Sequence, residues 1–151
     1  MPAGADRIFI DTNVLLYWMD SSQGRKYVAA REWIAAVWES RKGAISWQVL
    51  NEFYTNATAK LKMPAAGVRA LIRQYDAWGP ITQSLPLMER AWQWSDRAGV
   101  PYWDALILAA AEVAGAEYLL SEDFQTGRRY GSITIIDPFR TPPAAVLART
   151  K

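Results

Sequence analysis

Two acidic residues closely follow short apolar runs that have the composition of buried strands. Asp11 comes directly after residues 8–10, and Asp123 lies just beyond residues 118–120, with Glu122 as a competing carboxylate in the same loop. Short apolar runs bounded by polar residues are typical of buried strands. Because sites in open parallel sheets form at the carboxyl ends of the strands, Asp11 and Asp123 are candidate catalytic or metal-binding groups. Asp11 also has a purely structural interpretation, since Asp is a common helix N-cap residue.

Two further carboxylates lie in the early turns of predicted helices. Glu52 belongs to a helix predicted over residues 47–62 and lies off its apolar stripe, so it can reach over the strand ends. Asp104 lies at the start of the most apolar helix of the chain, over residues 102–114, where a buried charge is costly without a partner. Each also has a purely structural interpretation. Glu52 can be an exposed helical Glu, and Asp104 can be an Asp that the helix dipole favours in a first turn.

The residue types that are missing narrow the chemistry of such a cluster. The chain contains no His and no Cys. Disulfides, zinc sites built on thiolate or imidazole, and Ser-His-Asp or Cys-His nucleophilic sites are therefore excluded. Several carboxylates in one pocket repel each other unless a cation binds, and ligands that are all oxygen favour Mg²⁺ or Mn²⁺. Such an ion activates water and stabilises charge on a phosphoryl group, which indicates metal-dependent phosphodiester hydrolysis.

This hypothesis assigns a role to each candidate. The predicted metal-binding groups are Asp11, Asp104 and Asp123, and Glu52 is a further ligand or positions the attacking water. Small polar side chains next to these acids are expected to hold ligands or waters in place, and they are Thr12, Asn13 and Ser121.

The elements that must position these residues alternate between strands and helices. Strands are predicted at 8–10, 44–46, 118–120 and 133–136, a polar loop at 121–131, and helices at 14–19, 25–41 (ended by Gly43), 47–62, 64–75, 86–98 and 102–114. This alternation indicates one α/β domain over residues 1–151, with a mostly parallel sheet covered on both faces. Its core is expected to span about residues 6–139, and the tail 140–151 is expected to be peripheral.

The composition is that of an ordinary soluble globular domain. Hydrophobic residues make up 51% and charged residues 21% of the chain, and the net charge of +2 is weak evidence for a polyanionic partner. The first residues lack the pattern of a signal peptide, and the apolar stretch around residues 106–111 is too short to span a bilayer. We therefore expect a soluble, cytoplasmic protein without membrane association. Most of the eight Trp are expected in the core, and the remaining Trp side chains are candidates for a partner surface.

Four ordered segments resemble the PIN-domain ribonucleases, and within them the VapC-like toxins of type II toxin–antitoxin systems. The matching segments read FIDTNVLL at 9–16, VLNEF at 49–53, YWDALI at 102–107 and LLSEDF at 119–124. The resemblance spans nearly the whole chain and implies a three-layer α/β/α fold. It places Asp11, Glu52, Asp104 and Asp123 on the acidic quartet of the family.

The resemblance also implies an activity and partners. The implied activity is Mg²⁺- or Mn²⁺-dependent cleavage of RNA. The implied partners are a second copy of the chain, in a homodimer, and a small VapB-like antitoxin that neutralises the protein. Among the basic residues that can grip RNA, Arg128 and Arg129 are the most interesting pair, because they lie in the loop that carries Asp123. Two alternatives stay open: a PIN nuclease that processes RNA or acts on DNA outside any toxin–antitoxin pair, and a non-catalytic PIN-fold module that binds RNA or another partner.

Overall fold

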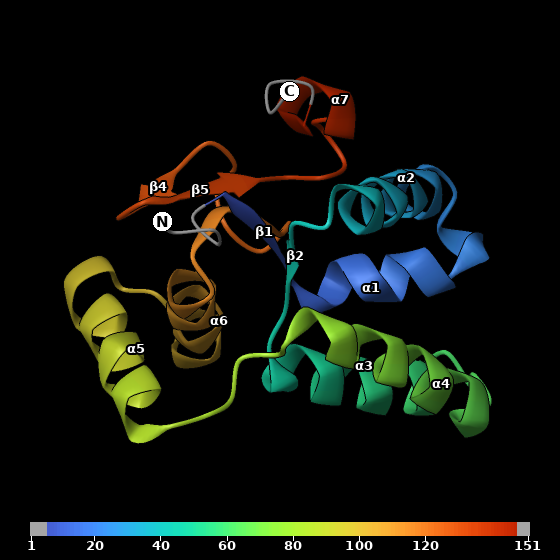
Figure 1. Cartoon of the computed structure of the whole chain (residues 1–151), viewed down its shortest axis with the longest axis horizontal. Helices are drawn as coiled ribbons and strands as arrows, with labels where there is room; N and C mark the ends of the chain where they lie inside the picture. Colours follow the sequence, from blue (N-terminus) through green and yellow to red (C-terminus); the bar gives the residue numbers. More distant parts are fainter. Residues whose placement is uncertain (1–5, 148–151) are drawn as a thin grey trace.

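A five-stranded sheet lies at the centre of the structure, a computed structural model that describes residues 6–147 (Figure 1). The strands follow the order β2-β1-β3-β5-β4, and all neighbours run parallel except β4 and β5, which are antiparallel. Their bounds are β1 Arg7–Ile10, β2 Gly43–Ala44, β3 Ala116–Leu120, β4 Arg129–Tyr130 and β5 Ile133–Ile136. The predicted mostly parallel sheet is confirmed.

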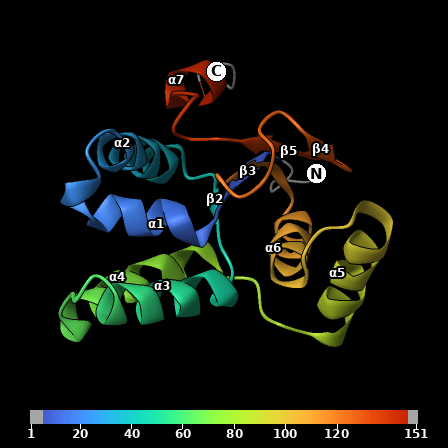
Figure 2. The ribbon, with the colours of Figure 1, turned by 180° about the vertical axis from the view of Figure 1, so that it is seen from behind.

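Helices flank this sheet, as the three-layer prediction requires. In Figures 1 and 2 the pair α1 and α2 lies on one side of the strands, and the pair α5 and α6 lies on the other. The helices are α1 Thr12–Met19, α2 Arg25–Ser40, α3 Trp47–Ala59, α4 Ala65–Tyr75, α5 Leu85–Ala98, α6 Tyr102–Val113 and α7 Pro143–Leu147. The α/β fold class is therefore confirmed.

The core fixes the two central strands and the helix α6. Phe9 in β1 and Leu119 in β3 are fully buried, and α6 is buried from Ala105 to Ala111. Burying one large apolar side chain of this kind stabilises the folded state by about 1.5–3 kcal/mol. The buried core therefore holds the carboxyl ends of β1 and β3 and the start of α6 in place.

Two local predictions were wrong. Gly43 does not end the second helix, which instead ends at Arg41 in the left-handed conformation with φ 59°. Gly43 belongs to β2, where the ring of Trp78 occupies the space that a Cβ atom would need. Residues 121–131 are not wholly loop, because Arg129 and Tyr130 form the edge strand β4.

The described part of the tail, residues 140–147, packs on the outside of α2. Trp33 donates a hydrogen bond from Nε1 to the carbonyl oxygen of Thr141 at 2.8 Å, and Val146 of α7 is buried. Residues 148–151 of the predicted tail lie outside the described residues. Most of the Trp side chains pack in or against the core, as predicted, whereas Trp92 and Trp103 are exposed.

No helix within residues 6–147 has both the length and the apolar character needed to cross a membrane.

Candidate active site

Asp11 and Ser121 lie side by side because of the strand register. Ile10 of β1 pairs with Leu120 of β3, so the next residue of each strand emerges at the same edge. Ser121 Oγ donates a hydrogen bond of 2.7 Å to Asp11 Oδ2 and accepts one of 3.0 Å from the backbone N–H of Asp123. This fully buried hydroxyl therefore links the two strand-end acids.

Asp11 caps a helix and also lies near other acids. It is the N-cap of α1, where Oδ1 accepts a hydrogen bond of 2.7 Å from the backbone N–H of Thr12. Burial raises the pKa of its carboxyl from 3.8 to about 7, against the lowering effect of the hydrogen bonds from Ser121 and Thr12. The negative charges of Asp123 and Asp104 also raise this pKa. A helix N-cap does not require other acidic side chains nearby. The neighbouring acids therefore make Asp11 a candidate functional group.

Glu52 is held over the strand ends by two polar side chains. Thr12 Oγ1 donates a hydrogen bond of 2.7 Å to Glu52 Oε1, and Gln48 Nε2 donates one of 3.4 Å to Oε2. Gln48 also donates to the backbone carbonyl of Trp103 at 3.2 Å. The start of α3 is therefore tied to the starts of α1 and α6, which carry the other acids.

Asp104 lies half-buried in the first turn of α6. Burial raises the pKa of its carboxyl, and the charges of Asp123 and Glu52 raise it further. The N-terminus of a helix favours a carboxylate, but that dipole effect is worth only about 0.3–1 kcal/mol. The effect of the charges of Asp123 and Glu52 on its pKa instead places Asp104 in one electrostatic cluster with them.

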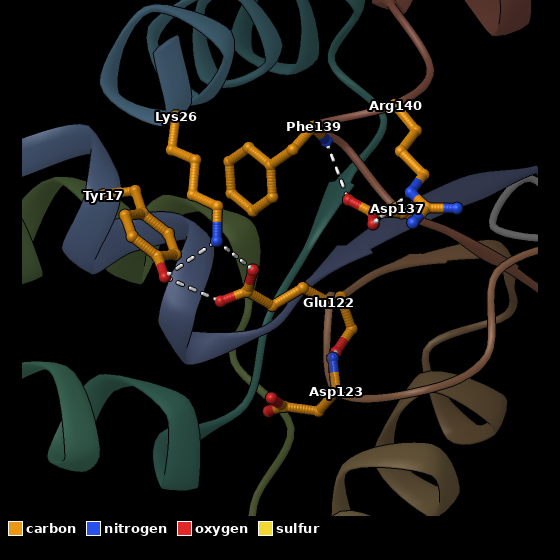
Figure 3. Close-up of polar contacts among 8 residues, drawn as sticks. Tyr17, Lys26, Glu122, Asp123, Asp137, Phe139 and Arg140 are labelled. Atoms are coloured by element: carbon orange, nitrogen blue, oxygen red, sulfur yellow. Dashed lines mark hydrogen bonds and ion pairs between the residues drawn. The ribbon is translucent and has the colours of Figure 1, made fainter. Parts of the chain in front are cut away.

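The structure distinguishes the two acids of the loop after β3. The Glu122 side chain is held by Lys26, whose Nζ lies 2.9 Å from Oε2, and by the hydroxyl of Tyr17, which donates to Oε1 at 2.8 Å. Figure 3 shows the Asp123 side chain pointing away from this ion pair. Burial and the charge of Glu122 raise the pKa of Asp123, whereas a hydrogen bond with Asn13 lowers it. Asp123 is therefore the better member of the acidic cluster.

All four predicted acids line one cavity of about 300 Å³. They come from four segments that are far apart in the sequence, namely the ends of β1 and β3 and the starts of α3 and α6. The cavity wall also contains two of the three predicted accessory residues, Thr12 and Asn13, while Ser121 lies buried behind it. The sequence-based prediction that these residues converge agrees with this geometry.

The donor set of this cavity fits a hard divalent cation, because its polar atoms include carboxylate and amide oxygens. The buried Asn13 Oδ1 has no hydrogen-bond partner within residues 6–147 and is a further oxygen donor. In that same part of the chain, no three acidic side chains already form a metal-binding group. Asp11 and Glu52 instead direct oxygens toward Thr12 and Ser121. The predicted metal-binding roles therefore stay predictions.

Arg128 and Arg129 do not line this cavity. The guanidinium of Arg128 stacks 4.7 Å from the ring centre of Tyr130, and Arg129 pairs with Thr134 in the edge strand. The sheet order places β5 between this edge strand and β3, which Asp123 follows. Neither Arg therefore lies beside the acids, although both follow Asp123 in the same segment of the chain. The role of the two Arg residues in RNA binding stays a prediction.

The competing acid Glu122 also lines the cavity, together with five residues that the sequence did not mark as site residues, namely Leu16, Gln48, Asn56, Trp103 and Ile107. Gln48 and Asn56 stand one turn before and one turn after Glu52, and this i, i+4 spacing places them on its face of α3. That spacing is a signal that could have identified them. Trp103 precedes Asp104, but only the tertiary structure shows that its ring is exposed.

Comparisons with known proteins agree with this geometry. The fold is similar to that of Mycobacterium tuberculosis VapC20, which is described as a Sarcin-Ricin loop cleaving toxin, with a TM-score of 0.60 and 24% sequence identity. The match covers 77% of this chain and 91% of that one. No curated protein sequence matches the chain. The family model of the PIN domain matches residues 8–130, and the chain therefore belongs to the PIN-domain family.

Proposed function

We propose that this protein is a metal-dependent endoribonuclease that hydrolyses RNA phosphodiester bonds and is the toxin of a type II toxin–antitoxin pair. The observation that carries the proposal is the cavity shared by Asp11, Glu52, Asp104 and Asp123. Burial raises the pKa of Asp11, Asp104 and Asp123, and the charges of neighbouring carboxylates raise it further. A cluster of this kind is costly unless a cation or protons neutralise it. In a metal-dependent nuclease this repulsion is useful, because it favours the binding of a divalent ion that neutralises the acids.

In this proposal the acids have distinct tasks. Asp11, Asp104 and Asp123 hold Mg²⁺ or Mn²⁺, which supplies Lewis-acid stabilisation of charge on the phosphate. Glu52 orients the attacking water or adds a ligand, and the hydroxyl of Thr12 keeps it in place. Ser121 fixes the relative position of Asp11 and of the loop that carries Asp123.

The toxin assignment rests on the family and on the fold that the chain shares with VapC20. On this assignment the substrate is a structured cellular RNA, and a VapB-like antitoxin neutralises the protein by covering the acidic cavity. We further propose that the protein acts as a homodimer in the cytoplasm. A neighbouring reading frame for a short antitoxin distinguishes this proposal from a PIN nuclease of RNA processing.

Cleavage of end-labelled structured RNA by the purified protein tests the enzymatic part. We expect cleavage with Mg²⁺ or Mn²⁺, no cleavage in EDTA, and a loss of at least about 100-fold in Asp104→Asn, which removes a charge that the reaction requires. Asp96→Asn is the matched control, because Asp96 is an exposed acid of α5 outside the cavity. Equal cleavage by Asp104→Asn and the wild type would refute the mechanism. Calorimetry that detects no metal binding, together with no cleavage, would favour the non-catalytic module.

Induced expression in cells tests the toxin part. We expect growth arrest that depends on Asp104 and that is relieved when the neighbouring antitoxin is expressed with it. Vigorous cleavage in vitro without growth arrest, or arrest that the Asp104→Asn variant also causes, would contradict the toxin assignment and leave a nuclease of another pathway.

A further inference from the structure

An aromatic groove adjoins the acidic cavity. It has a volume of about 630 Å³, and its walls include Trp47, Tyr102, Trp103 and Leu106. Gln48, Glu52 and Trp103 line both this groove and the acidic cavity, so the two hollows share a wall. A chain that places a phosphate among the acids therefore has this groove beside it.

Trp103 is the most exposed of the large hydrophobic side chains identified as exposed in residues 6–147, at 65% of its surface. Its backbone is nevertheless fixed, because it lies in the first turn of α6 and its carbonyl accepts the hydrogen bond from Gln48. The ring of Tyr102 lies edge-on to that of Trp103, with 5.4 Å between the ring centres. The result is a rigid backbone that presents an aromatic face beside Asp104.

The chemistry of the groove suits an uncharged, flat group. None of the residues that line it is Lys or Arg, so it offers no cation to a phosphate. Its lining includes the side-chain amides of Gln83, Asn51 and Gln48, and amide groups can donate and accept hydrogen bonds. The buried Oε1 of Gln48 has no partner among the described residues. A groove lined by both aromatic rings and amide groups is complementary to a nucleobase, which has two apolar faces and a polar edge.

We propose that this groove binds an unpaired nucleobase of the RNA, next to the phosphate held at the acidic cavity, with Trp103 as the stacking platform. The inference rests on the proposed ribonuclease function for the position of that phosphate. The groove thereby favours single-stranded or looped RNA, because a base in a regular duplex cannot leave its stack without loss of pairing. Trp103 is a substrate-binding residue in this scheme and takes no part in proton transfer.

Binding rather than cleavage tests the proposal. Every protein carries Asp123→Asn, which is outside the groove and prevents cutting of the probe, and the buffer contains Mg²⁺. Fluorescence anisotropy follows a labelled 12-nucleotide unstructured RNA and a strand of equal length built only from abasic ribose phosphates. Trp103→Ala and Trp103→Phe are compared with Trp92→Ala, an exposed Trp on α5 that does not line the groove.

If a base stacks on Trp103, the loss of this ring should weaken binding only of the strand that carries bases. Trp103→Ala should weaken binding of the normal strand on the order of 5- to 150-fold, which is the range found for one base on one aromatic side chain. Trp103→Phe should keep most of the affinity, and Trp92→Ala all of it. The abasic strand should bind the three variants equally. The exposure of Trp103 implies that all of them fold, which thermal unfolding checks.

Two outcomes would overturn the proposal. One is that Trp103→Ala weakens both strands equally or neither of them. The other is that RNA binding is unchanged while sedimentation shows loss of a dimer, which would assign the groove to a second copy of the chain. The wild-type protein, without Asp123→Asn, is also tested for cleavage. If it cuts RNA but Trp103→Ala affects the normal and the abasic strand alike, only the groove proposal fails. If the wild-type protein cuts no RNA but Trp103→Ala weakens binding of the normal strand alone, only the ribonuclease proposal fails.

Discussion

Replacing Asp11 by Asn should make the protein more stable at alkaline pH while abolishing its activity. Burial raises the pKa of Asp11 from 3.8 to about 7, so ionising this carboxyl in the folded protein is unfavourable. A difference of this size corresponds to about 4 kcal/mol. Below pH 3.8 both the folded and the unfolded state carry the proton, and there is no penalty. Between pH 3.8 and about 7 the penalty accumulates, so wild-type stability falls as the pH rises.

The composition of the chain makes this window easy to measure. With no His and no Cys, no side chain that has its ordinary pKa titrates near pH 7, where the carboxyl of Asp11 does. Urea unfolding in EDTA, followed by Trp fluorescence, should show the wild type losing about 3 kcal/mol from pH 5 to 8 through Asp11 alone. Asp11→Asn should lack that loss, because Asn keeps the N-cap acceptor without a charge. The raised pKa values of Asp104 and Asp123 add losses of the same sign in both proteins.

A divalent ion supplies the second half of the test. Mg²⁺ at pH 8 should restore stability to the wild type and not to Asp11→Asn, since an ion that binds the folded state stabilises it by mass action. A wild-type stability that is flat between pH 5 and 8 in EDTA would contradict the raised pKa of Asp11. An equal slope in the variant would assign the loss to other groups and refute the reasoning.

Two further predictions concern the support of the site and of the sheet. Lys26→Met should change the free energy of unfolding by less than about 1 kcal/mol, because its ion pair with Glu122 is partly exposed. It should nevertheless shift the acidic limb of the pH–rate profile upward, since the unpaired charge of Glu122 raises the pKa of Asp123 further. Gly43→Ala should destabilise the protein by about 1–3 kcal/mol in urea unfolding, because its Cβ would lie 2.5 Å from the Trp78 ring.

Each of these changes has a control in the chain. Lys60→Met removes an exposed Lys at the end of α3 and should leave the pH–rate profile unchanged. An equal shift in both Lys variants would show a general charge effect and not a local one. Gly67→Ala lies inside α4, where an added Cβ meets no atom within 4 Å, and should stabilise the protein by up to about 1 kcal/mol. Equal effects of the two Gly substitutions would contradict the packing argument at Gly43.

Local patterns in the sequence were sufficient for the fold class and for the members of the acidic cluster. The apolar run before Asp11 predicts a buried strand, and the long apolar segment after Asp104 predicts a buried helix, because burial imposes periodicity on neighbouring residues. The parallel order of such elements then places strand ends at one edge. The absence of His and Cys by itself limits a metal site in this chain to oxygen ligands.

Only the tertiary structure decided between groups that look alike in the sequence. Glu122 and Asp123 are adjacent acids, and the choice depends on Lys26, which lies 96 positions away and holds Glu122. The exposed ring of Trp103 likewise depends on how α6 meets α3, and the edge strand β4 depends on β5 as a partner. Such contacts join residues that are distant in the chain, so no local pattern reports them. The types of the reactive side chains are therefore readable from the sequence, whereas their partners, orientation and pKa values follow from packing.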